Sequence, residues 1–131
     1  MELVLLAVVA AALLVVITLI NRTTSGLDRK HFQQRWQKIE KIMQTPDVGL
    51  QLAVIDADKL LDQALKQTRT PGETMGERLR SARGRIKNYQ AVWDAHKLRN
   101  RLVHEDVKLK KSQARTAVGA FKSALKQLGA L

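Results

Sequence analysis

The stretch TPDVGLQLAVIDADKLLDQALKQ, residues 45–67, decides the fold, because its apolar residues recur with the period of an α-helix. One face of this helix carries five apolar residues, three or four positions apart: Leu50, Val54, Ala57, Leu61 and Leu65. The residues 45–47 look like an N-cap, a proline at the first helical position and an acid in the first turn. Asp58 and Asp62, together with Asp56, are interpreted as a solvated flank beside lysines. The stretch therefore predicts an amphipathic helix that buries one face.

The segments on either side have the same helical period. A first helix is predicted over residues 28–44, a third begins after a Thr70–Glu73 capping pattern, a fourth spans residues 88–102, and a last one starts near Leu109. Their apolar stripes are Phe32, Trp36, Ile39 and Met43; Met75, Leu79, Ala82 and Ile86; Tyr89, Val92, Trp93 and Ala95; and Ala114, Val118, Phe121, Leu125 and Leu128. These patterns predict an all-α fold, a small antiparallel bundle of four to five helices over residues 28–131.

The N-terminal segment has a different character. Residues 3–20 carry no charge, and Thr18 is their only polar side chain. Eighteen helical residues span roughly 27 Å, close to the thickness of a bilayer's hydrocarbon core. A cleaved signal peptide is the alternative, but Glu2 precedes the apolar run and the basic residues follow it. We expect a transmembrane anchor over residues 1–20, a tether over 21–27, and a single-pass protein of the inner or plasma membrane with its N-terminus outside and its bundle in the cytoplasm.

The charge of the chain points to polyanionic partners. The formal net charge is +11. The first 20 residues contribute only Glu2, so the other 111 residues carry 23 basic and 11 acidic side chains, a net charge of +12. A domain this basic is attracted to nucleic acid and to anionic lipid beside the anchor, and composition does not choose between them.

Several kinds of site have no support in the sequence. The chain has no cysteine, so it forms no disulfide and offers no thiolate to a metal. It also lacks a phosphate-binding GxxxxGK[ST] loop, a GxGxxG turn, an HExxH pair and a serine nucleophile elbow. His96 and His104 are eight positions apart, and His31 is remote from both. We therefore predict no metal site and no cofactor.

The stretch KLRNRLVHED, residues 97–106, holds the residues best suited to chemistry. An arginine such as Arg99 offers a planar fork for phosphate oxygens, and a histidine such as His104 can move a proton near neutral pH. Phosphodiester cleavage needs both functions. The alternative is a helix end whose basic residues meet the helix dipole, with Arg99 paired to Glu105 or Asp106.

The run Arg99-Asn100-Arg101-Leu102-Val103-His104 is an Rx4H motif placed before a final amphipathic helix. In this placement it resembles the HEPN superfamily (higher eukaryotes and prokaryotes nucleotide-binding), and the resemblance covers the bundle from about Asp28 to Leu128. It implies a homodimer with two facing motifs and RNA cleavage without metal. Carried over, Arg99 would hold the scissile phosphate, His104 would act as acid or base, and Asn100 would position them. The resemblance also admits an antitoxin or another protein partner.

The expected function is RNA binding by a membrane-anchored bundle, with metal-independent endoribonuclease activity at Arg99 and His104. The alternative is a non-catalytic interaction module that binds a protein partner or anionic lipid at the inner membrane face. Under either function, binding is expected at seven basic residues: Arg78, Arg80, Arg83, Arg85, Lys87, Lys97 and Arg101. Trp36 and Trp93 are assigned to core packing in preference to base stacking, because both lie on apolar stripes.

Overall fold

The protein is described by a computed structural model that covers residues 1–23 and 26–131, with side chains for residues 1–19 and 26–131. The described residues form six α-helices and one short 3₁₀ helix, without a strand: α1 (Glu2–Thr23), α2 (Arg29–Ile42), α3 (Val48–Gln67), α4 (Met75–Ser81), η1 (Arg83–Arg85), α5 (Tyr89–His104) and α6 (Lys111–Gln127). The predicted all-α class is confirmed.

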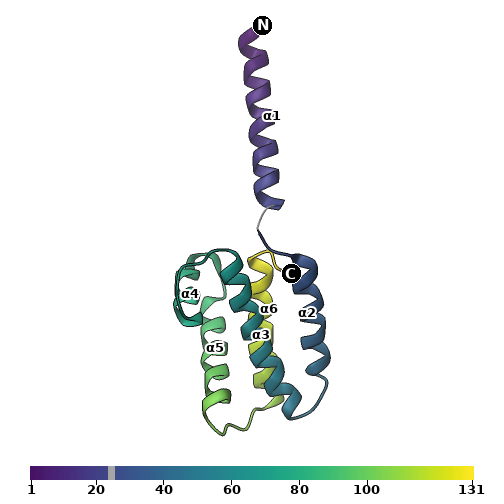
Figure 1. Cartoon of the computed structure of the whole chain (residues 1–131), viewed down its shortest axis with the longest axis vertical. Coiled ribbons are helices and arrows are strands. Elements are labelled where there is room, and N and C mark those ends of the chain that lie inside the picture. The colour runs from purple at the N-terminus through teal and green to yellow at the C-terminus, as the bar shows by residue number, and fades with distance from the viewer. Residues whose placement is uncertain (24–25) are drawn as a thin grey trace.

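Helix α1 projects away from the end of the bundle at which α2 begins (Figure 1). Its residues Glu2–Leu19 have a mean hydropathy of 2.8, and none of them is buried. Length and composition therefore suffice for a membrane span. The helix continues to Thr23, so the first residues of the predicted tether over 21–27 are helical. Residues 24–25 of that tether lie outside the described residues.

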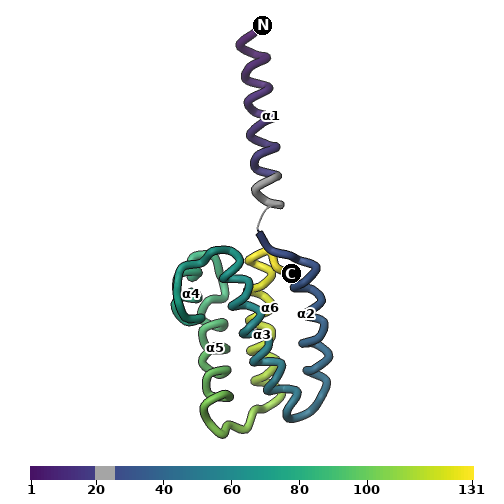
Figure 2. Tube along the Cα trace, in the orientation of Figure 1, coloured from purple at the N-terminus to yellow at the C-terminus, as the bar shows by residue number. Residues whose placement is uncertain are grey.

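Helix α3 is the centre of the bundle, because α2, α5 and α6 all pack against it. The four long helices lie side by side, and the chain reverses direction between α2 and α3 and between α5 and α6 (Figures 1 and 2). The short α4 lies beside α5 at the end of the bundle that α1 joins (Figure 1). This arrangement places one flank of α5 between α3 and α4.

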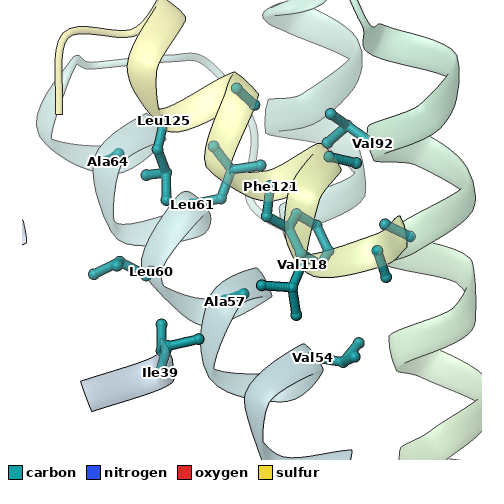
Figure 3. Close-up of a cluster of buried hydrophobic side chains, with 14 of the residues drawn as sticks. Ile39, Val54, Ala57, Leu60, Leu61, Ala64, Val92, Val118, Phe121 and Leu125 are labelled. Carbon is teal, nitrogen blue, oxygen red and sulfur yellow. The ribbon is translucent and has the colours of Figure 1, made fainter. Parts of the chain in front are cut away.

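The apolar stripes meet in a single core (Figure 3). Leu61 and Leu65 from α3 and Phe121 and Leu125 from α6 are fully buried there. Most predicted stripe residues belong to this core, while Met43, Met75, Tyr89 and Trp93 are half-buried at its edge. Burial of one such large side chain contributes roughly 1.5–3 kcal/mol relative to exposure, so the stripes account for the packing of the bundle.

The predicted capping pattern at Thr70–Glu73 is wrong by four residues. Thr74 is the N-cap of α4: its hydroxyl accepts from the Glu77 N–H at 3.2 Å, and the Glu77 carboxylate accepts from the Thr74 N–H at 3.1 Å. Thr70 instead ends α3, where its N–H donates to the Leu65 carbonyl after Arg69 adopts a positive φ of 56°. This is a Schellman cap. Because the Thr70 N–H is already bonded to α3, Thr70 ends one helix and does not begin the next.

The predicted start of α3 also differs. Thr45 is the predicted N-cap, but Asp47 occupies that position in the structure. It has a φ of 57° and forms no side-chain capping hydrogen bond. Gly49 is buried directly after this turn, and a Cβ there would lie 2.5 Å from the Ile42 carbonyl oxygen. Close approach of the α2 C-terminus to the first turn of α3 therefore sets where α3 begins.

Candidate anion-binding site

Arg99 lies on the face of α5 that is turned toward α3. Its Nη1 donates a hydrogen bond to Asn100 Oδ1 at 2.9 Å, and its Nε lies 3.5 Å from Asp58 Oδ2. The Nε atom is buried and has no hydrogen-bond partner among the described residues, so the contact with Asp58 is electrostatic. The expected alternative pairing of Arg99 with Glu105 or Asp106 does not form; Arg101 lies 3.5 Å from Glu105 instead.

His104 is not brought to Arg99 within one chain. It is the last residue of α5, its side chain is exposed, and it forms no hydrogen bond or ion pair with the described part of the chain. Five positions along an α-helix turn a side chain by about 140° and advance it by about 7.5 Å. Arg99 therefore faces α3 while His104 faces solvent at the end of the helix.

A different histidine stands beside Arg99. His96 Nδ1 lies 2.8 Å from Asp58 Oδ1, and His96 Nε2 lies 3.4 Å from Asn100 Nδ2. Asp58 is 2% exposed and His96 is 7% exposed. The interpretation of Asp58 as part of a solvated flank is thus wrong, because the packing of α5 on α3 covers it.

His96, Arg99 and Asn100 form part of the wall of a shallow pocket between α4 and α5, of about 390 Å³. We call it the Arg99 pocket; it is lined by Thr74, Met75, Gly76, Arg80, Trp93, His96, Lys97, Arg99 and Asn100. Three of these side chains are cationic at neutral pH. Lys97 is ion-paired with the exposed Asp94 at 3.1 Å and Arg99 lies beside Asp58, but no carboxylate is among the lining residues. The pocket is therefore suited to an anion.

The seven predicted basic residues have different surroundings in the structure. Arg80 and Lys97 line the Arg99 pocket, and the Arg80 guanidinium lies over the Trp93 ring at 5.4 Å. The remaining exposed members, which lie outside the pocket, are Arg83, Arg85, Lys87 and Arg101. Arg83 lies over the Tyr89 ring at 5.3 Å, and Arg85 donates to the Thr70 hydroxyl.

Arg78 does not belong to an exposed basic face. It is 6% exposed, and its Nε and Nη2 donate to the two carboxylate oxygens of Asp62 at 2.7 and 3.0 Å. Its Nη1 donates to the Gly72 carbonyl at 2.8 Å. Partial burial raises the pKa of Asp62, but the hydrogen bonds from Arg78 and Lys66 outweigh this and hold the pKa below its ordinary value. Arg78 therefore joins α4 to α3 and is not available to a ligand.

The two tryptophans differ in their surroundings. Trp36 is buried, as predicted, and its Nε1 donates to Glu40 at 2.9 Å. Trp93 is half-buried at the edge of the core and also lines the Arg99 pocket. Its ring lies 6.0 Å from the His96 ring. Trp93 thus combines core packing with a place in the pocket wall.

The sequence pattern singles out Arg99 and Asn100, and helical spacing places His96 three positions before Arg99 on the same face. It does not assign a role to His96 or connect either residue with Asp58. Asp58 lies 38 positions before His96, and no local pattern connects them.

Comparison of the chain with models of known protein families finds no match, and neither curated proteins nor solved structures yield one.

Proposed function

We propose that the bundle is an RNA-binding domain held at the cytoplasmic face of the membrane by α1, and that the Arg99 pocket receives a backbone phosphate and cleaves the RNA without a metal. The observation that carries this proposal is the cationic lining of the pocket by Arg80, Lys97 and Arg99. The Nη2 of Arg99 forms no hydrogen bond with the described residues, so it is free to donate to a phosphate oxygen. The net charge of +12 beyond residue 20 supplies long-range attraction.

The resemblance to the HEPN superfamily supports the same activity and adds a homodimer. Because His104 lies on a different side of α5 from Arg99, it would reach a phosphate on Arg99 only from a second copy of the chain. A dimer of this kind would place the exposed end of α5 in an interface. The oligomeric state of the purified chain tests this part of the proposal.

RNA binding is measured with the full-length chain in zwitterionic micelles, by fluorescence anisotropy of a labelled single-stranded RNA. We expect Arg99→Gln to weaken binding about tenfold, the value of one charge-assisted hydrogen bond of about 1.4 kcal/mol. The slope of log K against log salt should fall in magnitude by about 0.7, which corresponds to one phosphate contact. Arg115→Gln is the matched control, since it removes the same charge from an exposed position on α6, outside the pocket and outside the seven expected binding residues.

Equal affinities and equal salt slopes for Arg99→Gln and Arg115→Gln would show that the pocket does not hold phosphate. Cleavage is followed separately on a denaturing gel in the presence of EDTA, where the proposed activity persists. Thermal unfolding of each variant, followed by tryptophan fluorescence, separates loss of binding from loss of fold, because both tryptophans lie in the bundle.

A second function is favoured by another observation. Gly26 lies against the Gln67 carbonyl, so the chain enters the bundle at the end where α3 finishes. Four exposed basic residues lie at or after the C-terminus of α3 and around η1: Arg69, Arg83, Arg85 and Lys87. They would lie close to the membrane surface and bind anionic lipid. Stronger binding of the chain to anionic vesicles than to RNA at equal salt would favour this interaction module over the ribonuclease.

A further inference from the structure

The contacts around His96 fix which of its ring nitrogens carries the proton. Arg99 Nη1 can only donate, so the Asn100 atom it meets at 2.9 Å is the amide oxygen. The Asn100 amide nitrogen then faces His96 Nε2 at 3.4 Å, and that nitrogen also only donates. Nε2 is therefore the acceptor, and the proton is on Nδ1, which donates to Asp58 at 2.8 Å. The donors run in one direction, from Arg99 through Asn100 and His96 to Asp58.

This arrangement leaves the Nε2 lone pair facing the Arg99 pocket. Its contact with Asn100 is long, at 3.4 Å, so a stronger donor can displace it. Gly76 lies opposite, and a Cβ at this position would come within 3.9 Å of Nε2 and 3.8 Å of the Trp93 ring. The absence of a side chain at Gly76 therefore keeps the approach to Nε2 open.

A contribution to stability does not by itself explain why Asp58 and His96 are buried together. Asp58 lies among apolar residues of α3, and a buried charged pair contributes little net stability compared with apolar side chains of similar size. A buried carboxylate that holds a histidine in one tautomer, with the other nitrogen directed into a cationic pocket, is the arrangement that general base catalysis requires.

We propose that His96, oriented by Asp58, is the catalytic base of the Arg99 pocket. This inference rests on the proposed binding of RNA and replaces His104 in the catalytic role. With a phosphodiester on Arg99, His96 Nε2 takes the proton of the adjacent ribose 2′-hydroxyl. The 2′-oxygen forms a bond to phosphorus, the bond from phosphorus to the 5′-oxygen breaks, and the leaving 5′-oxygen takes a proton from water. The imidazolium then returns its proton to solvent, and the products carry a 2′,3′-cyclic phosphate and a 5′-hydroxyl.

The decisive variant is His96→Asn in the full-length chain in zwitterionic micelles. An asparagine amide can still donate to Asp58 from the place of Nδ1 but cannot accept the hydroxyl proton. We expect RNA cleavage in EDTA to fall by about 100-fold or more, the usual contribution of a general base, while RNA affinity stays within about twofold. His31→Asn is the matched control, because the His31 side chain lies on α2, outside the Arg99 pocket, and contacts Gln63 and the Phe32 ring. It should cleave as the unaltered chain does.

Asp58→Asn gives a second readout through the orientation of His96. Asp58 also lies 3.5 Å from Arg99 Nε, so RNA affinity is measured alongside the pH profile. The charged groups near the imidazole are Asp58 from α3, Arg80 from α4, and Lys97 and Arg99 from α5, with Asp94 of α5 ion-paired to Lys97 at 3.1 Å. Removal of the carboxylate that contacts the imidazole directly makes the imidazolium less favourable. The pH below which the cleavage rate falls should therefore be lower in Asp58→Asn than in the unaltered chain. The maximal cleavage rate of the variant should also be lower. A purely structural pair would lower stability without moving the pH profile.

The outcomes separate the two proposals. Failure of the chain to bind RNA defeats the proposed function itself. Binding without cleavage defeats the proposed ribonuclease activity and, with it, the role of His96. Cleavage that survives His96→Asn overturns the role of His96 alone and leaves the proposed function intact; its loss in His104→Ala would then assign the base to His104. If His96→Asn proves unfolded by tryptophan fluorescence, the pH profile of Asp58→Asn decides, and an unshifted profile overturns the role of His96.

Discussion

Replacement of Asp62 by asparagine tests whether the ion pair with Arg78 holds α4 against α3. The Arg78 guanidinium donates three hydrogen bonds: two to Asp62, at 2.7 and 3.0 Å, and one to the Gly72 carbonyl at 2.8 Å. An asparagine keeps one acceptor oxygen, and its amide nitrogen cannot accept from Arg78. The variant therefore leaves a buried guanidinium with one donor unpaired and no counter-charge.

The magnitude follows from the burial of the two partners. Removal of one member of a fully buried pair costs about 3–5 kcal/mol. The Arg78 side chain is 8% exposed and that of Asp62 is 18% exposed, so solvent still reaches the carboxylate. We therefore expect a loss near the lower limit, about 2–3 kcal/mol. For a domain of roughly 100 residues this lowers the melting temperature by about 8–24 °C.

The assay is thermal unfolding of the full-length chain in zwitterionic micelles, followed by tryptophan fluorescence. Asp94→Asn is the matched control, because Asp94 forms an ion pair with Lys97 in which both side chains are more than half exposed. It should cost less than about 0.5 kcal/mol.

The pH dependence supplies the test that could refute this reasoning. The folded-state pKa of Asp62 lies below its ordinary value of 3.8, so its contribution is fully present above that value and is lost as pH falls through the folded pKa. The gap in stability between the unaltered chain and Asp62→Asn should hold from pH 7 to about pH 5 and narrow below pH 4. A gap that is absent at pH 7, or that stays constant down to pH 3, would contradict a stabilising ionised pair.

Three further changes address packing, backbone and capping, each measured by the same unfolding assay. Phe121→Ala empties the centre of the core and should cost about 3–5 kcal/mol, since Phe121 is fully buried. Gly49→Ala places a Cβ 2.5 Å from a carbonyl of the α2 C-terminus and should cost about 1–3 kcal/mol, against no loss for Gly119→Ala, which meets nothing within 4 Å. Thr74→Ala removes the hydroxyl cap of α4 and should cost about 1 kcal/mol, whereas Thr116→Ala, at an exposed position within α6, should not destabilise the bundle.

The helices themselves were predictable because their signal is local. An apolar residue every three or four positions buries one face of a helix whatever it packs against, so the stripes of α2, α3, α5 and α6 could be read directly. The uncharged run that forms α1 and the net positive charge of the residues after it could likewise be predicted, because both depend on composition alone. Arg99 and Asn100 were found because their motif is continuous in the chain.

The caps and the buried polar side chains depend on more distant parts of the chain. The Thr-x-x-Glu pattern occurs at Thr70 and again at Thr74, and the first is excluded only because the end of α3 already uses that backbone. The pattern within the local sequence is the same in both places, so it cannot distinguish them.

For the functional site, local patterns in the sequence indicate an arginine and several histidines in a basic helical domain. Which histidine shares Asp58 and Asn100 with Arg99 depends on the tertiary structure. Helical geometry turns His104 away from Arg99, whereas the packing of α5 on α3 buries Asp58 against His96 across 38 positions. The physical reason is that helical period specifies a residue's face, but the neighbour that covers that face depends on how the whole bundle packs.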